Sequence, residues 1–436
     1  MERRKLLITG AAALSIGARR ILGANDRVRV GLIGLGGRGN AHLSSLLTIK
    51  TVQMSAICDV NQAARERANA RITKAGQDKA TEFADMRKLF DSKDIDAVSM
   101  ATPNHWHALG AIWAMQAGKD TYCEKPASYN PFESKQMIAA ARKYNRMCQI
   151  GSQSRSTPHV MEAMQVLKEG AIGKVYMAKG LCYKRRKSIG RKPDAPVPPG
   201  LDWDMFLGPA PMRPFNELRF AYNWHWFWDT GNGDLGNQGV HQMDIARWGM
   251  DLANDHSGLK SVVSTGGKYA YDDMQETPNT QICSFDYGDR EVVFEVRGVL
   301  TGGEGTLGTA NKATSTVGNL FYGVDGWMEL DGSGYRVYKG ETNEVAKDVK
   351  AERGPDGTTR HMENFYEAVK SRDHKKLNAE IEIGAAAADF CHFANISYRT
   401  GKRLAWDSAK HSFDDAAANK LLTRDYRKPY VVSAKV

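Results

Sequence analysis

The sequence predicts an α/β protein with a doubly wound parallel sheet near its N-terminus and a second domain after it. The chain has 436 residues, which is more than one ordinary hydrophobic core accommodates, so two domains are expected. A buried-strand pattern at residues 27–33 leads directly into a glycine-rich run. Strand and helix patterns then alternate up to residue 151, as they do in parallel α/β sheets.

The composition is that of a globular enzyme, with 42% hydrophobic and 25% charged residues. The formal net charge is +10, but the sequence has no long basic run of the kind that binds nucleic acid. The one basic cluster, residues 184–187, predicts either a solvated loop or a cationic patch at a site entrance that favours anionic substrates. The six cysteines lack CxxC spacing, so buried single thiols are expected, without a metal site or a disulfide framework.

Residues 1–24 have the features of an export signal. The pair Arg3-Arg4 precedes an apolar run at residues 6–18, and small residues follow up to Ala24. This arrangement resembles a twin-arginine signal, a route that carries folded proteins, and it predicts cleavage near Ala24 and a periplasmic protein. An uncleaved tail is the alternative. The apolar run is too short for a permanent membrane-spanning helix, and none is expected in the rest of the chain.

A GxGxxG spacing, formed by Gly34, Gly36 and Gly39, lies between the first predicted strand and a predicted helix. Glycines at these positions permit a tight turn and a close approach of the backbone to a pyrophosphate at the helix N-terminus. Gly37 and Arg38 belong to the same loop and are expected to contact the cofactor. The sequence therefore predicts a dinucleotide site.

An acidic residue follows the second predicted strand, residues 52–57. This residue, Asp59, lies twenty positions after Gly39, where a carboxylate accepts hydrogen bonds from the hydroxyls of a ribose. Its negative charge would repel a 2′-phosphate, so NAD is expected in preference to NADP.

Polar residues also follow the next two predicted strands, and parallel strands bring their carboxyl ends to one edge of the sheet. These residues are Pro103, Asn104 and His107 after residues 96–101, and Glu124 and Lys125 after residues 120–123. Lys125 is expected in the cofactor crevice, where partial desolvation would lower its pKa and let it exchange a proton with a substrate hydroxyl. The alternative is an ordinary surface lysine.

Four aromatic rings stand just before a glycine-rich turn at residues 229–236. These rings, Trp224, Trp226, Phe227 and Trp228, are candidates for stacking on a sugar ring. Packing in the hydrophobic core is the alternative.

A helix is predicted after this turn, and Asn237, His241 and Asp244 would share one of its faces. Histidine titrates near neutral pH, so His241 is a candidate proton carrier. Alternatively, it makes only a structural hydrogen bond.

These motifs occur in the order seen in the Gfo/Idh/MocA family, which includes glucose–fructose oxidoreductases and inositol dehydrogenases. The resemblance rests on the glycine motif, the Pro103-Asn104 turn, Glu124-Lys125-Pro126 and Gly239-Val-His241-x-x-Asp244. It implies an N-terminal Rossmann domain and a C-terminal domain with a large, mostly antiparallel sheet. It also implies dimers or tetramers that form through the open face of that sheet.

By this resemblance, Lys125 and His241 are the catalytic pair beside the nicotinamide. The family often has an aspartate four residues before the histidine, and Asn237 stands there in this chain. Asparagine can orient a hydroxyl but cannot stabilise an imidazolium by its charge, although Asp234 or Asp244 would be able to do so.

Two further contacts are implied by the same resemblance. Gln153 and Arg155 follow the fifth predicted strand, residues 148–151, where the family lines the nicotinamide and the substrate. Gln153 is therefore expected to contact the cofactor, and Arg155 is expected to contact the substrate together with the tryptophans and Asp244.

The remaining patterns predict the elements of both domains. Residues 1–24 are expected to be the signal, residues 25–150 the NAD-binding domain, and residues 151–436 the domain for substrate binding and oligomerisation. Helices are predicted from residue 40 and at residues 64–75, 107–117, 158–169, 361–371 and 382–400. Further strands are predicted at residues 175–184, 260–269, 281–287, 291–298, 326–330 and 335–339. Loops are predicted at residues 191–214 and 301–318.

The predicted activity is hydride transfer between NAD and a hydroxyl carbon of a sugar, glycoside or cyclitol. An exported enzyme has no pool of free NAD, so a tightly bound and recycled cofactor is expected. The alternative activity is glycoside cleavage through a transient 3-keto intermediate. A protein that only binds a sugar, with NAD as a structural ligand, is a third reading. Neither a nucleic acid nor a membrane is expected as a partner.

Overall fold

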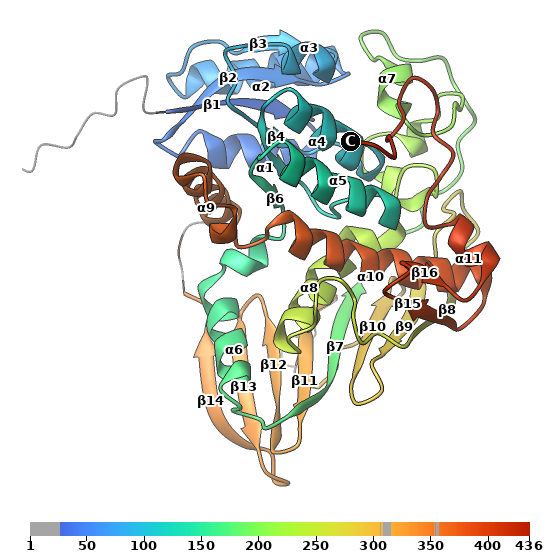
Figure 1. Ribbon diagram of the computed structural model, residues 1–436. Helices are drawn as coiled ribbons and strands as arrows, with labels where there is room; N and C mark the ends of the chain where they lie inside the picture. Colours follow the sequence, from blue (N-terminus) through green and yellow to red (C-terminus); the bar gives the residue numbers. More distant parts are fainter. Residues whose placement is uncertain (1–26, 306, 308–314, 353, 355–356) are drawn as a thin grey trace, which may run out of the picture.

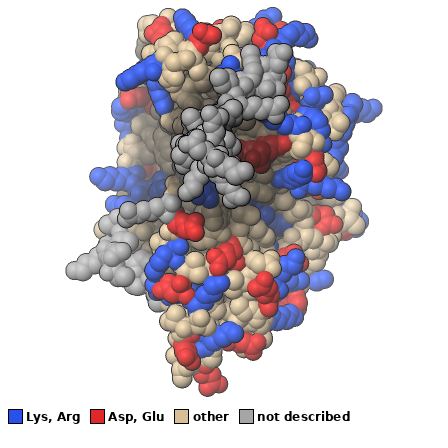
Figure 2. All heavy atoms as spheres, turned by 90° about the vertical axis from the view of Figure 1, so that its left-hand side faces the viewer, with Lys and Arg blue, Asp and Glu red and all other residues tan. Residues whose placement is uncertain are grey.

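The computed structural model describes residues 27–436, except for residues 306, 308–314, 353 and 355–356. The predicted export signal lies outside the described residues. Within the described part of the chain, no helix has both the length and the apolar character that are needed to cross a membrane. Figure 2 shows basic and acidic side chains interspersed over one face of the molecule.

The N-terminal half contains a sheet of six parallel strands in the order β3-β2-β1-β4-β5-β6 (Figure 1). The strands are β1 (Val28–Ile33), β2 (Val52–Cys58), β3 (Thr81–Phe83), β4 (Ala97–Met100), β5 (Asp120–Cys123) and β6 (Cys148–Ile150). The strand order reverses between β1 and β4, and such a switch point opens a crevice beyond the carboxyl ends of the strands. The predicted Rossmann-type sheet is confirmed.

Five helices accompany this sheet: α1 (Gly37–Leu46), α2 (Gln62–Lys74), α3 (Met86–Phe90), α4 (Asn104–Gln116) and α5 (Pro131–Lys143). Two of them begin earlier than predicted, α1 at Gly37 instead of residue 40 and α4 at Asn104 instead of residue 107. The α5 helix was not predicted, although Pro131 in its first turn and the capping side chain of Asn130 are recognisable start signals.

The second sheet has ten strands in the order β14-β13-β12-β11-β7-β10-β9-β8-β15-β16. Among these neighbours, only β7 and β10 run parallel, which confirms the mostly antiparallel sheet. The strands are β7 (Val175–Lys184), β8 (Ser261–Gly267), β9 (Thr280–Asp286), β10 (Glu291–Arg297), β11 (Ser315–Gly323), β12 (Gly326–Asp331), β13 (Gly334–Lys339), β14 (Glu344–Lys350), β15 (Leu404–Asp407) and β16 (Ser412–Phe413).

Helices α6 (Pro158–Lys168), α8 (Val240–Gly249) and α10 (Ile381–Thr400) cover one face of the large sheet (Figure 1). Their apolar side chains form one core with the strands, in which the rings of Phe285 and Phe390 stack at a centroid distance of 4.2 Å. Burial of each such ring contributes roughly 1.5–3 kcal/mol to folding. This core fixes α8, and hence its first turn, against the strands.

Segments from the end of the chain return to the first sheet. Helix α9 (Gly357–Ser371) packs Met362 and Phe365 against α1, and Tyr430 packs beside Trp106 of α4. Residues that follow β14 in the chain therefore contribute to the hydrophobic core of the cofactor-binding half.

Three predictions of local structure were wrong or incomplete. The predicted loop at residues 191–214 contains the short helix α7 (Trp203–Leu207), whose Trp203 stacks on Phe206 at 4.8 Å. The range of the predicted loop at residues 301–318 overlaps with β11, which begins at Ser315. Strand β14 was not predicted, because it is an almost fully exposed edge strand without an alternating apolar pattern.

All six cysteines are buried and free, as predicted. Cys391 donates a hydrogen bond to the carbonyl of Leu235, and the neighbouring His392 contacts the Ser128 hydroxyl at 3.0 Å. Both residues therefore make contacts within the core of the protein.

Candidate active site

A cavity of about 690 Å³ lies beyond the carboxyl ends of the parallel strands and reaches the second half of the chain. Its wall brings together residues from the glycine loop, from the ends of β2, β4 and β5, and from two segments that precede α8. These residues include Gly34, Gly36, Gly37, Arg38, Asp59, Pro103, Asn104, His107, Glu124, Lys125, Tyr222, Trp224, His225 and Asn237. Most of the predicted cofactor contacts therefore meet in one place.

The glycine loop has the shape that a dinucleotide requires. A side chain at Gly39 would collide with the carbonyl of Gly34, and one at Gly34 would lie 2.7 Å from Ala101 O, in a backbone conformation with φ of +83°. At Gly36 and Gly37, by contrast, the space above the backbone is open. The first N–H groups of α1 have no acceptor within the helix, and no side chain caps them. The loop therefore fits the pyrophosphate of NAD.

We expect Gly36→Ala to weaken NAD binding by at least about tenfold, because its methyl group would enter the open space that a pyrophosphate needs. Protein stability should change by less than about 1 kcal/mol, since the backbone at Gly36 is extended and no atom lies near the new methyl group. Calorimetric titration with NAD and thermal unfolding test both parts. Gly39→Ala should instead lower the melting temperature, and unchanged NAD affinity in Gly36→Ala would contradict the assignment.

Asp59 holds the glycine loop against the end of β2. Its carboxylate accepts hydrogen bonds from the backbone N–H of Leu35 at 2.6 Å and of Asn61 at 2.8 Å. Burial raises the pKa of Asp59, and these two N–H groups oppose the rise. Each carboxylate oxygen retains acceptor capacity, so Asp59 can also receive ribose hydroxyls from a bound dinucleotide.

Glu124 is buried at the end of β5 and is held by groups from α1. It forms an ion pair with Arg38 at 2.6 Å and contacts His42 Nε2 at 2.9 Å. Burial alone would raise the pKa of Glu124, but Arg38 and His42 hold it well below its usual value. The other carboxylate oxygen accepts the backbone N–H of Lys125 at 3.1 Å. Glu124 therefore fixes the backbone that carries Lys125.

The ammonium group of Lys125 crosses to the second half of the chain, where its Nζ donates a hydrogen bond to the carbonyl oxygen of Asn237 at 2.6 Å. Burial lowers the pKa of Lys125 to about 8, although Glu124 acts in the opposite direction. A lysine with this pKa can hold or release a proton near neutral pH. Lys125 is thus a polar member of the cavity wall rather than a surface lysine.

Asn237 lies in a π-helical turn, Leu235–Gly239, which leads into α8. Such turns are rare and recur at functional sites. The side chain of Asn237 donates to the hydroxyl of Tyr222 at 2.9 Å and faces Asp234 at 3.4 Å. Its contact with Lys125 is made by the backbone, so the link to the lysine does not depend on which side chain stands at this position.

His241 is buried in the first turn of α8, and its Nδ1 has no hydrogen-bond partner among the described residues. Burial lowers the pKa of His241 to about 3, and Lys125 acts in the same direction. The imidazole is therefore neutral at ordinary pH. Neither Asp234 nor Asp244 hydrogen-bonds to it in the part of the chain that the structure describes, because each is paired with an arginine.

Arg155 and Asp244 were predicted to contact the substrate, and the structure pairs them with each other instead. Two hydrogen bonds of 2.7 and 2.8 Å join the guanidinium group to the carboxylate, which is 1% exposed. Arg155 also lies over the ring of Trp248 at 4.6 Å. This buried pair anchors α8 to the segment after β6.

The predicted aromatic platform is only partly present. Trp224 lines the cavity and stacks on His225 at 3.6 Å. The prediction is not supported for the other tryptophans, since Trp226 is buried below Arg186 and Trp228 lies beside Arg399, both outside the cavity wall. Tyr222 and His225 also line the cavity and were not predicted, although His225 lies within the same aromatic run and Tyr222 lies two residues before it.

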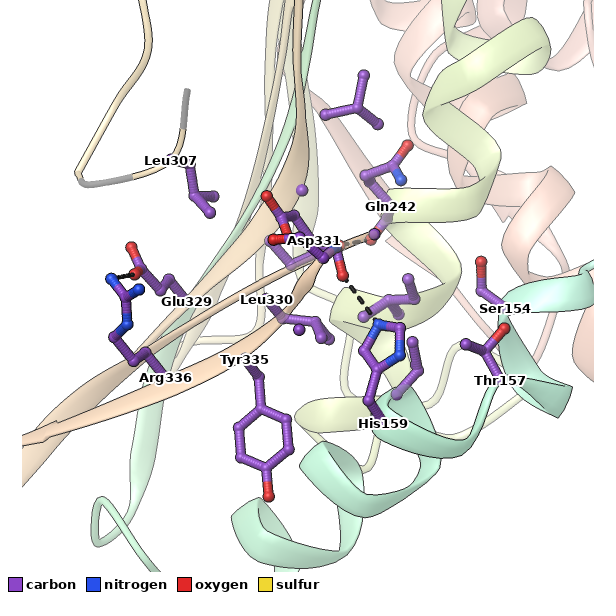
Figure 3. A pocket seen from close by; sticks show the side chains of 18 of the residues that line it. Ser154, Thr157, His159, Gln242, Leu307, Glu329, Leu330, Asp331, Tyr335 and Arg336 are labelled. Carbon is purple, nitrogen blue, oxygen red and sulfur yellow. Dashed lines mark hydrogen bonds and ion pairs between the residues drawn. The ribbon is translucent and has the colours of Figure 1, made fainter. Parts of the chain in front are cut away.

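A second cavity, of about 890 Å³, lies between α6, α8 and the ends of β11 to β14. Gln153 lines this cavity and not the first one, so its predicted contact with the nicotinamide is not supported. Figure 3 shows His159 pointing from α6 toward Asp331, whose carbonyl oxygen lies 2.9 Å from its Nε2. No group of residues with the make-up of a metal site occurs among the described residues.

Comparisons with known proteins agree with this geometry. Residues 28–152 match the model of an oxidoreductase family with an NAD-binding Rossmann fold, named GFO_IDH_MocA. Residues 163–275 and 325–432 match the C-terminal α/β domain of the same family.

Individual relatives are more distant. The chain is 30% identical over 245 residues to a levoglucosan dehydrogenase of Pseudarthrobacter phenanthrenivorans, covering 55% of each chain. It is 31% identical over 154 residues to a glycosyl hydrolase family 109 protein of Shewanella sp. strain W3-18-1, covering 34% of each. The matches thus span about a third to a half of these relatives. A levoglucosan dehydrogenase solved with NADH and levoglucosan has the same fold, with a TM-score of 0.65 and 19% identity over 87% of this chain and 99% of the other.

Proposed function

This chain belongs to the Gfo/Idh/MocA oxidoreductase family, and we propose that it oxidises or reduces a hydroxyl-bearing carbon of a carbohydrate with NAD as its cofactor. The observation that carries the proposal is the position of Lys125. Its ammonium group lies in the wall of the dinucleotide cavity, which Tyr222 and Trp224 also line. The relation to a levoglucosan dehydrogenase supports a carbohydrate as the substrate.

In this mechanism Lys125 exchanges the hydroxyl proton. Bound NAD supplies the hydride chemistry at the carbinol carbon. The carbonyl of Asn237 fixes the ammonium group at 2.6 Å, and Glu124 fixes its backbone. With a pKa of about 3, the imidazole of His241 is too weak a base to take the hydroxyl proton. His241 lies outside the cavity wall, and we assign its neutral ring to orienting a substrate hydroxyl by a hydrogen bond. Trp224 offers a flat ring to the sugar.

The pH dependence of the reaction rate should show whether Lys125 or His241 exchanges the hydroxyl proton. With neutral Lys125 as the base, kcat/KM for alcohol oxidation should rise about tenfold per pH unit and level off above the lysine pKa of about 8. Reduction of the ketone should show the opposite trend, because it needs the protonated lysine. Initial rates between pH 6 and pH 10 measure this profile. A single inflection near 6.5 would assign the proton transfer to a histidine instead.

A second candidate function is glycoside cleavage, which the match to a glycosyl hydrolase family 109 protein favours. In this cycle carbon 3 of the sugar is oxidised to a ketone, which acidifies the C–H at carbon 2. Loss of that proton expels the aglycone from carbon 1 by elimination. Water then adds to carbon 1, carbon 2 regains a proton, and the ketone is reduced, so the cycle has no net redox change.

One experiment distinguishes the two functions. Purified protein is mixed with NAD⁺ and a panel of free sugars and aryl glycosides, and reduced nicotinamide and released aglycone are followed together. Reduced nicotinamide in proportion to the sugar, without aglycone, supports the dehydrogenase. Aglycone release without net reduction supports the glycosidase.

We also propose that the protein is exported with its cofactor tightly bound and that it forms a homo-oligomer through the large sheet. The twin arginines in the first residues support export. Fusion of residues 1–26 to a reporter, with and without Arg3→Lys and Arg4→Lys, tests export. Light scattering of the purified protein tests the oligomer.

A further inference from the structure

The turn that holds Lys125 is itself held by a buried ion pair. Asp234 stands immediately before the π-helical turn, Leu235–Gly239, and is 4% exposed. Arg186 binds its carboxylate with two hydrogen bonds, from Nη2 at 2.6 Å and from Nε at 3.0 Å. A bidentate pair of this kind adds geometric specificity as well as energy. The start of the turn is therefore fixed by Arg186.

Arg186 is carried by the segment after β7, and this segment is fastened to the second sheet. The residue belongs to the basic cluster at residues 184–187, but its side chain is only 13% exposed. Its backbone N–H donates to the carbonyl of Gly298 at 2.8 Å, and its own carbonyl oxygen accepts the hydroxyl of Tyr271. The guanidinium group lies over the ring of Trp226 at 5.1 Å. Arg186 is therefore a fixed structural cation and not a solvated one.

The ion pair reaches Lys125 through one residue, Asn237. The side-chain amide of Asn237 lies 3.4 Å from Asp234 Oδ1 and donates to the hydroxyl of Tyr222 at 2.9 Å. Arg186 Nη1 donates to the same hydroxyl at 3.2 Å. The backbone carbonyl oxygen of Asn237 accepts a hydrogen bond from Lys125 Nζ at 2.6 Å. A single asparagine therefore lies between the Asp234 carboxylate and the ammonium group.

The charges of this pair oppose each other at Lys125. A carboxylate near an ammonium group favours its protonated form, and a second cation favours the neutral form. Arg186 and Asp234 lie 2.6 Å apart, so their opposite charges largely cancel at Lys125. Other charged or titratable groups around Lys125 are Arg38, His107, Glu124, Lys184, Tyr222, His225, His241 and Cys391. Substitutions at residues 186 and 234 leave all of these groups in place.

We propose that Arg186 is a positioning residue for the proton transfer, because it cancels the charge of Asp234 and thereby leaves Lys125 able to release its proton. This inference rests on the proposed function. Neither Arg186 nor Asp234 lines the cavity, so the pair acts through the Asn237 turn and not on the substrate. Without Arg186, the Asp234 carboxylate would be uncompensated and would hold the proton on Lys125.

The test measures the protonation of Lys125 directly, on the protein without substrate. Acetic anhydride reacts with neutral amines and not with ammonium groups. Lys125 lines the cavity, where a small reagent can reach it. Mass spectrometry follows the rate of acetylation of the peptide that contains Lys125 between pH 6 and pH 10. Burial lowers the pKa of Lys125 to about 8, so the wild-type rate should rise with its midpoint there.

Variants of the pair should shift this midpoint in opposite directions. Arg186→Met should raise it by about one pH unit, because it leaves the carboxylate of Asp234 uncompensated. Asp234→Asn should lower it by a similar amount, because it leaves the guanidinium group uncompensated. The double variant should return close to the wild-type midpoint. At pH 7, kcat/KM for alcohol oxidation should fall about tenfold in Arg186→Met and recover in the double variant. Loss of structure alone does not produce opposite signs and recovery.

Arg155→Met is the matched control. Arg155 and Asp244 form another buried bidentate pair that holds α8, and neither hydrogen-bonds to Asn237 in the described part of the chain. Loss of this pair should lower stability and leave the acetylation midpoint unchanged.

Two results would overturn the inference: equal midpoints in the wild type, Arg186→Met and Asp234→Asn, or shifts of the same sign in both variants. Asp234→Asn keeps the shape of the side chain, so the absence of a downward shift would overturn the inference even if Arg186→Met did not fold. If the wild type oxidised no sugar, the proposed function itself would fail, while the acetylation midpoints would still decide the effect of Arg186 on Lys125.

Discussion

Replacement of Lys125 by methionine is expected to lower kcat/KM by about 10²- to 10⁴-fold, the range in which a positioned acid–base group contributes. Methionine keeps most of the side-chain volume but cannot exchange a proton or donate to the Asn237 carbonyl. NAD binding should persist, because the glycine loop and Asp59 are unchanged. Steady-state kinetics on a responding sugar and calorimetry with NAD measure the two effects.

A buried lysine just before the same strand, β5, provides the control. Lys119 is 6% exposed and donates to the carbonyls of Ser92 at 2.6 Å and Ile95 at 2.8 Å, away from the cavity. Lys119→Met should lower stability while kcat/KM of the folded protein stays within about threefold. Equal losses of activity in both variants would show that Lys125 acts through stability alone. Full biological function of a Lys125→Ala, His241→Ala variant would favour a sugar-binding protein over an enzyme.

The Asp244→Asn substitution is expected to lower the free energy of unfolding by about 3–5 kcal/mol, because it leaves the Arg155 charge buried without its partner. The shape of the side chain is kept, so the effect reports charge rather than packing. Urea denaturation followed by tryptophan fluorescence measures it.

The control for this second prediction is an exposed ion pair. Lys174 and Asp289 lie 3.0 Å apart, with side chains that are 63% and 54% exposed. Asp289→Asn should leave the urea midpoint unchanged, because solvent screens such pairs. If Asp244→Asn behaved in the same way, Arg155 and Asp244 would be available for a role in binding.

The cofactor half of the molecule was predictable because its signals are local. Gly34, Gly36 and Gly39 stand directly between a strand and a helix, and the buried strands read as continuous apolar runs. Strands β3 and β14 were not predicted, because short or exposed strands carry no apolar pattern. Their pairing is decided by neighbours that are distant in the sequence.

The candidate site was predicted as a set of residues but not as a set of contacts. The spacing of Asn237, His241 and Asp244 indicated one helix face, but it does not show that Asp244 meets Arg155, a residue 89 positions away. Similarly, the sequence could not show that Asn237 contacts Lys125 through its backbone carbonyl oxygen and not through its side chain. The buried Trp226 shows that an aromatic run alone does not distinguish a binding platform from a core.

The hydrogen bond from Lys125 to the carbonyl of Asn237 joins the strand that ends at the cofactor to the turn that borders the sugar. An ammonium donor makes such a bond stronger than a neutral amine does. When Lys125 gives up a proton in the proposed reaction, its ammonium group becomes a neutral amine that holds the Asn237 carbonyl less firmly. We therefore expect the proton transfer to weaken the contact between the two halves of the crevice.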